Sequence, residues 1–162
     1  MFYFAYGTDL DPTEFRARCP QSREIGVAAL PDHRLHFPAY SERWSGGAVG
    51  LAVAHGHRVW GYVYQLDPQD LVALEREEVW FGEGDPRNRV ERSTGMVELT
   101  RPDDGSIPRR LRVTLYAARP TQGEAPSAAW LEVAVRGARA RTLPEEYLAE
   151  LVATPVAGGA TE

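Results

Sequence analysis

The sequence predicts an α+β fold, in which a mixed, mostly antiparallel sheet curls into a barrel-like core with about four short helices. Strand signals outnumber helix signals, and most strand segments are joined by links of hairpin length. The chain has 162 residues, 43% of them hydrophobic, which is enough for one well-buried core and too little for two ordinary domains. No repeat or linker divides it. We therefore expect a single domain over residues 1–155 and a flexible C-terminal tail over 156–162.

Seven segments carry strand signals, either by alternation or as short apolar runs bounded by Gly, Pro or Asp. They are residues 2–6, 25–30, 33–38, 47–55, 58–65, 95–101 and 110–118. Between the fourth and the fifth, His55-Gly56-His57 is typical of a hairpin turn, where histidines usually face solvent. No carboxylate or third ligand lies nearby at metal-ligand spacing, so we expect no metal site.

Four segments carry helix signals. The first begins at Asp11-Pro12-Thr13-Glu14, which offers a capping side chain, a proline at the first helical position and an acid in the first turn. The same pattern recurs at Asp67-Pro68-Gln69-Asp70. We expect these two helices to end before Pro20 and at Glu78, a third to run from about Ser127 to Arg136, where Gly137 stops it, and a fourth to start at Pro144.

Composition excludes several classes of function. The 18 basic and 23 acidic residues give a net charge of −5 without long runs of either sign, so we expect a small-molecule partner and neither nucleic acid nor a membrane. Cys19 is the only cysteine, which excludes an intramolecular disulfide and a Cys-rich metal site. Every basic residue is an arginine, which excludes Schiff-base lysine chemistry and a P-loop lysine.

The same composition bears on the origin and location of the protein. Its bias toward Arg, Ala, Gly and Pro is typical of GC-rich coding and suggests a bacterial source. The sequence has no secretory leader and no apolar stretch of the length of about 18 residues that a membrane helix needs. We therefore expect a soluble, cytoplasmic protein.

The first strand leads directly into a glycine turn, Gly7-Thr8-Asp9-Leu10. A turn of this kind can direct several backbone N–H groups at one point, which makes it a candidate site for an anion or an oxyanion. A buried strand followed by a tight turn into a helix explains the same pattern without any ligand. A second feature that supplies chemistry would decide between the two interpretations.

Glu78 is a candidate for that chemistry. Leu71, Leu74 and Glu78 are spaced at i, i+3 and i+7, so the helix face that buries the two leucines also turns the Glu78 carboxylate inward, while Glu75 points elsewhere. A buried acid must find hydrogen-bond donors or raise its pKa above about 4.3. Either outcome suits a general base or acid at neutral pH.

The alternative is a structural glutamate at the end of a helix. Such a side chain would reach solvent or pair with an arginine such as Arg76 or Arg89. Helix C-termini disfavour negative charge, and Glu77 and Glu78 lie together at one, which is a local cost without an evident structural benefit.

These residues also carry a resemblance to a known family. Residues 3–10, Tyr-Phe-Ala-Tyr-Gly-Thr-Asp-Leu, are similar to the Tyr-Phe-Ala-Tyr-Gly-Ser-Asn-Leu motif of the γ-glutamylcyclotransferase-like family. Residues 74–78, Leu-Glu-Arg-Glu-Glu, are similar to its Leu-Asp-x-x-Glu, whose last glutamate is catalytic. Further similar segments follow in the family's order over nearly the whole chain, at 29–37, 44–48, 59–64, 125–127, Trp130, Gly137 and 143–147.

The resemblance implies the γ-glutamylcyclotransferase-like fold and a reaction without cofactor or metal. The α-amine of a γ-glutamyl amide attacks its own γ-carbonyl, which releases 5-oxoproline and a free amine. The resemblance assigns Glu78 the role of base and then acid, and it implies a small γ-glutamyl amide or amino-acid-like substrate and a monomer or homodimer. The substrate-binding residues it implies are Tyr3, Phe4, Ala5, Tyr6, Gly7, Thr8, Asp9, Leu10, Gly46, Gly47 and Trp130.

The sequence departs from the family pattern at several of these positions. Asp9 replaces an asparagine, so an amide donor becomes a carboxylate that only accepts. Val79 replaces the glycine after the catalytic glutamate, and valine resists the positive φ that such a helix exit favours. Thr8 replaces a serine, and Trp130 stands where members can carry a tyrosine. A tyrosine that members often carry after this helix is absent, since none lies between 64 and 116.

Aromatic and arginine side chains near Glu78 would suit a larger γ-glutamyl amine, such as a biosynthetic intermediate, although the aromatics could equally belong to the core. They are Trp44, Trp80, Phe81, Arg87 and Arg89. The segment 81–88 is predicted to be a loop that contacts the leaving amine. Two other functions stay open: a binding protein for an acidic metabolite that has lost turnover, and a lyase or hydrolase that uses Glu78 on another acyl group.

Overall fold

The computed structural model describes residues 1–100 and 105–158, and it confirms the predicted α+β class with a barrel-like sheet and four helices among these residues. The elements are β1 (Phe2–Ala5), the 3₁₀ helix η1 (Thr8–Leu10), α1 (Pro12–Arg18), β2 (Arg23–Ser41), β3 (Gly46–Gln65), α2 (Pro68–Glu78), β4 (Val90–Leu99), β5 (Arg110–Ala118), α3 (Ala128–Ala140) and α4 (Glu145–Val152). Arg101, the end of one predicted strand, and residues 159–162 of the predicted tail lie outside the described residues.

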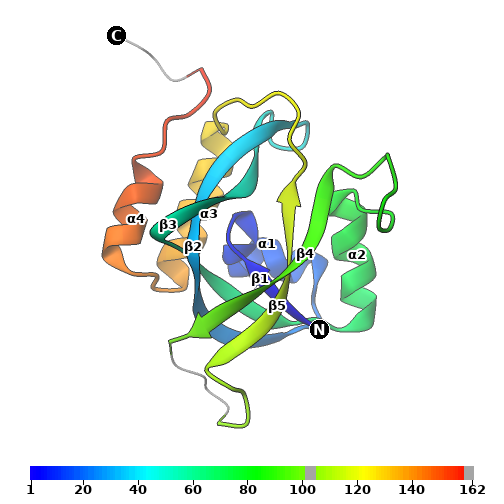
Figure 1. Cartoon of the computed structure of the whole chain (residues 1–162), viewed down its shortest axis with the longest axis vertical. Coiled ribbons are helices and arrows are strands. Elements are labelled where there is room, and N and C mark those ends of the chain that lie inside the picture. The colour runs from blue at the N-terminus through cyan, green and yellow to red at the C-terminus, as the bar shows by residue number, and fades with distance from the viewer. Residues whose placement is uncertain (101–104, 159–162) are drawn as a thin grey trace.

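The five strands close into a barrel in the order β1-β3-β2-β4-β5. β1 runs antiparallel to β3 and parallel to β5, where Tyr3 is opposite Thr114. In Figure 1, α3 and α4 lie on one side of the barrel and α2 lies on the opposite side, next to β4. The helices are nevertheless connected, because η1 and α1 lie between α3 and α2 and residues of all four helices share one hydrophobic cluster.

β2 and β3 are longer than the sequence predicted. Each combines two predicted strands into one: β2 continues through residues 31–32, and in β3 the segment around Gly56 does not form the hairpin turn that we expected. Residues 54–57 of β3 instead bulge opposite Asp32 of β2, whose side chain accepts a hydrogen bond of 3.0 Å from the Gly56 N–H. The two neighbouring histidines are exposed, and no group of three or more His, Cys, Asp or Glu among the described residues could hold a metal ion.

The helices begin where the capping patterns predicted, with Asp11, Asp67 and Ser127 each accepting a hydrogen bond from the first turn. The predicted end of α3 is wrong, because this helix continues past Gly137 to Ala140. A Cβ at Gly137 would lie 2.3 Å from the backbone nitrogen of Asp11. The glycine therefore permits close packing of α3 on the chain that follows η1, and it does not terminate the helix.

None of the helices in the described part of the chain has the length and the hydropathy that are needed to cross a membrane.

Candidate active site

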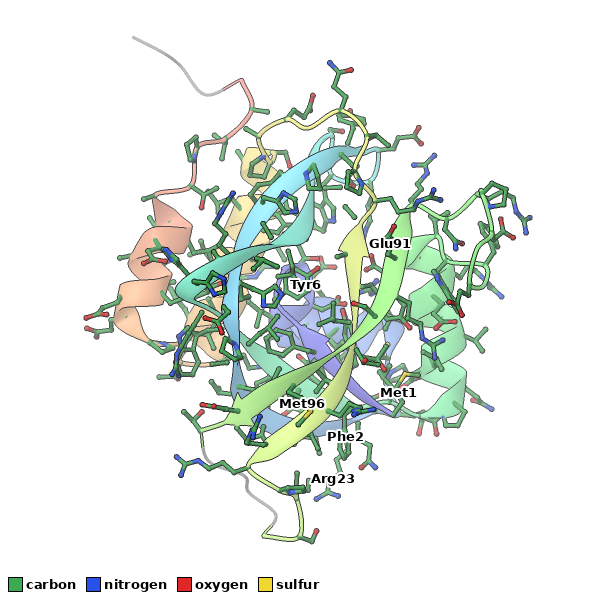
Figure 2. All side chains as sticks on the ribbon, in the orientation of Figure 1. Met1, Phe2, Tyr6, Arg23, Glu91 and Met96 are labelled. Carbon is green, nitrogen blue, oxygen red and sulfur yellow. The ribbon has the colours of Figure 1, made fainter. Side chains whose placement is uncertain are left out.

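A cavity of about 540 Å³ opens where the C-terminal ends of β1, α2 and β5 come together. The residue after β1, Tyr6, lies among the side chains that the strands enclose (Figure 2). The β2–β3 hairpin, α3 and the segments 86–90 and 118–121 also contribute to the wall. Residues of the wall that bear on the chemistry are Tyr3, Tyr6, Gly7, Thr8, Asp9, Glu77, Glu78, Val79, Tyr116 and Trp130.

The structure brings together most of the site residues that the sequence predicted, but not all of them. Glu78 lines the cavity, as do Tyr3, Tyr6, Gly7, Thr8, Asp9 and Trp130. Phe4, Ala5 and Leu10 are instead completely buried in the core. Gly46 and Gly47 pack against residues 124–127, where a Cβ would lie 2.4 Å from the Ser127 nitrogen and 2.0 Å from the Glu124 oxygen, respectively. These two glycines allow two segments to approach each other, and neither belongs to the cavity wall.

The turn after β1 leaves backbone donors beside the cavity. Leu10 N–H donates to the Gly7 carbonyl and Asp11 N–H to that of Thr8, each over 3.1 Å, which forms the single turn of η1. The N–H groups of Gly7, Thr8 and Asp9 donate none of the hydrogen bonds found among the described residues. The first N–H groups of a helical turn have no partner within it, so these three are available to an anionic group.

The Asp9 side chain is buried and is held by two donors. The Tyr3 hydroxyl donates to its Oδ2 atom over 2.7 Å, and Arg18, from the end of α1, forms an ion pair with its Oδ1 atom. The Asp9 carbonyl accepts a third hydrogen bond, of 2.9 Å, from the Tyr64 hydroxyl. The negative charge of Asp9 is therefore matched within the protein, so it does not face an anionic ligand without compensation.

Glu78 is the last residue of α2, and about 30% of its side chain stays exposed. One of its carboxylate oxygens, Oε1, lies 3.7 Å from Nη1 of Arg18, so its partner is neither of the two arginines that the sequence suggested. Burial raises the pKa of Glu78 above its ordinary value, and the positive charges of Arg18 and Arg43 oppose this increase. A raised pKa makes a carboxyl group better suited to accept a proton and then to donate it.

The residue after Glu78 has a strained backbone. Val79 adopts the left-handed conformation, with φ 62° and ψ 60°. The Trp80 N–H donates to the Glu75 carbonyl over 2.9 Å and so closes the helix end, as it would after a glycine. Val79 thus adopts a left-handed conformation that a β-branched residue disfavours, and this conformation costs roughly 1–2 kcal/mol of folding free energy.

Sequence reasoning missed Tyr116 of β5. Its side chain lines the cavity, and its hydroxyl donates to Glu75 over 2.6 Å. Arg92 of β4 donates to the same glutamate oxygen over 3.0 Å, and its guanidinium stacks on Trp80. Strand alternation could not have found it, because Leu111, Val113 and Leu115 mark the inward face of β5 and Tyr116 falls on the other face, where packing against distant residues buries it.

The aromatic and arginine side chains proposed to contact the amine divide into two groups. Trp44 and Arg89 line the cavity, whereas Trp80, Phe81 and Arg87 do not. Arg87 pairs with Asp85 at 2.8 Å and stacks on Phe81. The loop that carries them is closed by Asn88, whose side chain accepts from the Phe81 N–H and donates to the Gly82 carbonyl.

Comparisons with known proteins agree with this architecture. The sequence pattern of the AIG2-like family matches residues 58–151. The chain is 29% identical over 155 residues to a gamma-glutamylcyclotransferase of Mus musculus, covering 93% of this chain and 77% of the relative. It is 30% identical over 154 residues to a gamma-glutamylcyclotransferase of Bos taurus, covering 92% of this chain and 76% of the relative.

Solved structures show the same fold. A gamma-glutamyl cyclotransferase superposes with a TM-score of 0.84 at 23% identity, covering all of this chain and 92% of the other. A Homo sapiens protein superposes with a TM-score of 0.82 at 24% identity, covering 99% and 91% of the two chains. At these identities the similarity establishes the fold.

Proposed function

Because the chain belongs to the γ-glutamylcyclotransferase-like (AIG2-like) family, we propose that it cleaves a γ-glutamyl amide and releases 5-oxoproline and a free amine. One observation carries the proposal: Glu78, a carboxyl group with a raised pKa, lines the same cavity as the free N–H groups that follow β1. A single acid–base group and a set of anion-binding donors are what this reaction requires of an enzyme.

The bond changes are intramolecular. The α-nitrogen of the γ-glutamyl group forms a bond to its own γ-carbonyl carbon, and the bond from this carbon to the nitrogen of the leaving amine breaks. Neither water nor a cofactor is consumed. Because the nucleophile and the carbonyl belong to one molecule, the enzyme's main task is to hold the glutamyl chain folded with the two atoms in contact.

Glu78 would move the protons. The substrate amine enters as an ammonium group and must lose a proton before it can attack, so ionised Glu78 would accept that proton. The amine that leaves must gain one, so protonated Glu78 would then return it. The raised pKa of Glu78 supports both steps, because it lessens the difference between the pKa of the base and the pH of the medium.

The N–H groups of Gly7, Thr8 and Asp9 would bind either the substrate α-carboxylate or the oxygen that becomes negative during attack. The cavity is larger than a glutamyl group needs, and Trp44 and Arg89 would meet the amine portion. We expect a free small-molecule substrate in the cytoplasm, and the size of the cavity favours a larger γ-glutamyl amine.

The test is a panel of γ-glutamyl amines with detection of 5-oxoproline by mass spectrometry, using Glu78→Gln beside the unaltered protein. Product from the unaltered protein alone supports the proposal. Product that persists in Glu78→Gln would show that another group is the base. Tight binding without any product would identify a binding protein, and release of the amine together with free glutamate would identify a hydrolase.

A further inference from the structure

Arg18 lies between three carboxylates at the cavity wall. It is the last residue of α1, and only 8% of its side chain is exposed. Its Nη2 atom forms the ion pair with Asp9, while its Nη1 atom lies 2.6 Å from Glu77 and 3.7 Å from Glu78. One guanidinium thus connects Asp9, which replaces the asparagine of the family motif, with the proposed base Glu78.

The burial of Arg18 makes this arrangement electrostatically strong. A charge that is shielded from water acts on a neighbour about 4 Å away several times more strongly than the same charge in solvent. Nη1 makes no well-aligned hydrogen bond among the described residues, so it acts on both glutamates mainly through its charge. Glu78 therefore lies in the field of Arg18, and that field is partly cancelled by Asp9 and Glu77.

We infer that Arg18 is a positioning residue that holds the Glu78 carboxylate at the cavity and sets the pH at which it ionises, with Asp9 as the opposing charge. The catalytic part of this inference rests on the proposed function, whereas the ionisation of Glu78 does not.

Other charged and titratable groups face Glu78 from every side. Arg43, in the β2–β3 turn, is 40% exposed and lies 3.3 Å from Glu14, so water and that partner weaken its effect. Glu77 precedes Glu78 on α2. The remaining groups are the hydroxyls of Tyr3, Tyr6 and Tyr116, whose pKa values are all raised, mainly by burial, so they stay neutral at physiological pH.

The two substitutions at the ion pair have opposite expected effects. Arg18→Met removes the positive charge nearest to Glu78, so the Glu78 carboxyl should ionise at a higher pH. Asp9→Asn removes a negative charge that offsets Arg18, so Glu78 should ionise at a lower pH, and the asparagine restores the residue of the family motif. A merely structural role for Arg18 predicts no such opposite pair of shifts.

The experiment compares Arg18→Met, Arg18→Lys, Asp9→Asn and the control Arg16→Met. Arg16 lies on the same helix, but it donates to the Ser22 carbonyl and pairs with Glu24, away from the cavity. Two quantities are measured: the acid limb of kcat/KM for 5-oxoproline formation, and the titration of the Glu78 carboxyl by carbon-13 NMR, assigned from the signal that Glu78→Gln removes.

We expect the Glu78 titration and the acid limb to move up by about one pH unit or more in Arg18→Met and down in Asp9→Asn. Arg18→Lys should stay close to the unaltered protein, and Arg16→Met should leave both quantities unchanged. If Arg18→Met or Asp9→Asn moves the Glu78 titration no further than Arg16→Met does, the inference is wrong. If Arg18→Met does not fold, Asp9→Asn decides: a downward shift of the Glu78 titration supports the inference, and a shift no larger than that of Arg16→Met overturns it.

The two proposals fail separately. If the unaltered protein makes no 5-oxoproline from any γ-glutamyl amide, the proposed function fails, and the NMR titration still tests the effect of Arg18 on Glu78. If product forms but its acid limb does not follow the Glu78 titration across the variants, Glu78 is not the base.

Discussion

The Tyr116 hydroxyl donates a hydrogen bond of 2.6 Å to Glu75, one helical turn before Glu78. Arg92 donates to the same glutamate oxygen, so two neighbouring strands, β5 and β4, anchor the last turn of α2. The position of Glu78 at the cavity thus depends on a contact made one turn away.

Tyr116→Phe should therefore destabilise the protein by about 1–3 kcal/mol, because a mostly buried carboxylate loses one of its two donors. Urea unfolding measures the change. The matched control is Tyr40→Phe, because Tyr40 also lines the cavity, is 49% exposed and makes no hydroxyl hydrogen bond among the described residues. Equal losses in the two variants would show that the Glu75 contact contributes little.

Val79→Gly should stabilise the fold by about 1 kcal/mol, because glycine adopts the left-handed conformation without the strain of a β-branched side chain. Val79→Ala is the control, since it also shortens the side chain but keeps a Cβ at the same φ. Denaturant midpoints measure both changes. A glycine variant no more stable than the alanine variant would mean that the surroundings relieve the strain.

The raised pKa of Glu78 predicts a pH-dependent cost in stability. The folded state binds the Glu78 proton more tightly than the unfolded chain does. Protonated Glu78 therefore stabilises the fold fully below about pH 4.3, and this stabilisation is lost as the pH rises through the folded-state pKa of Glu78. Glu78→Gln should thus gain stability relative to the unaltered protein as the pH rises from about 4.3 through the folded-state pKa of Glu78. A difference in unfolding free energy that stays constant over this range would contradict the raised pKa.

Arg89→Ala should raise KM for a γ-glutamyl amine, because Arg89 lines the cavity and its pairing with Glu42, at 3.6 Å, is exposed to solvent. Arg87→Ala should leave KM unchanged, since that side chain is held by Asp85 and Phe81 outside the cavity wall. Steady-state kinetics on one substrate compare the two. The same KM for both variants would show that Arg89 does not contact the amine.

Sequence reasoning succeeded where the cause is local. The starts of α1 and α2 follow from Asp11 and Asp67, whose side chains cap the helix from one residue before it. It failed where the cause is tertiary. Gly137 does not end α3, since this glycine allows the helix to pack closely against the backbone of Asp11. The segment at Gly56 forms a bulge in place of a turn, and the Gly56 N–H donates to the side chain of Asp32.

The same distinction applies to the site. Helical spacing predicted that Glu78 faces inward, and Glu78 does line the cavity, because the direction of its side chain follows from its place on the helix. Spacing could not show that the Asp9 carboxylate is matched by Arg18, nor that Tyr116 reaches the wall, because both contacts depend on how distant segments pack.

The pairing of β1 with both β3 and β5 affects how the protein is made. β1 is synthesised before both of its neighbours in the barrel, which are residues 46–65 and 110–118. Contacts this distant in sequence form late in folding. On the ribosome, the cavity beside the turn after β1 would therefore not form until β5 has emerged. A chain that stops before residue 118 should contain the proposed base and still lack the cavity that would bind substrate.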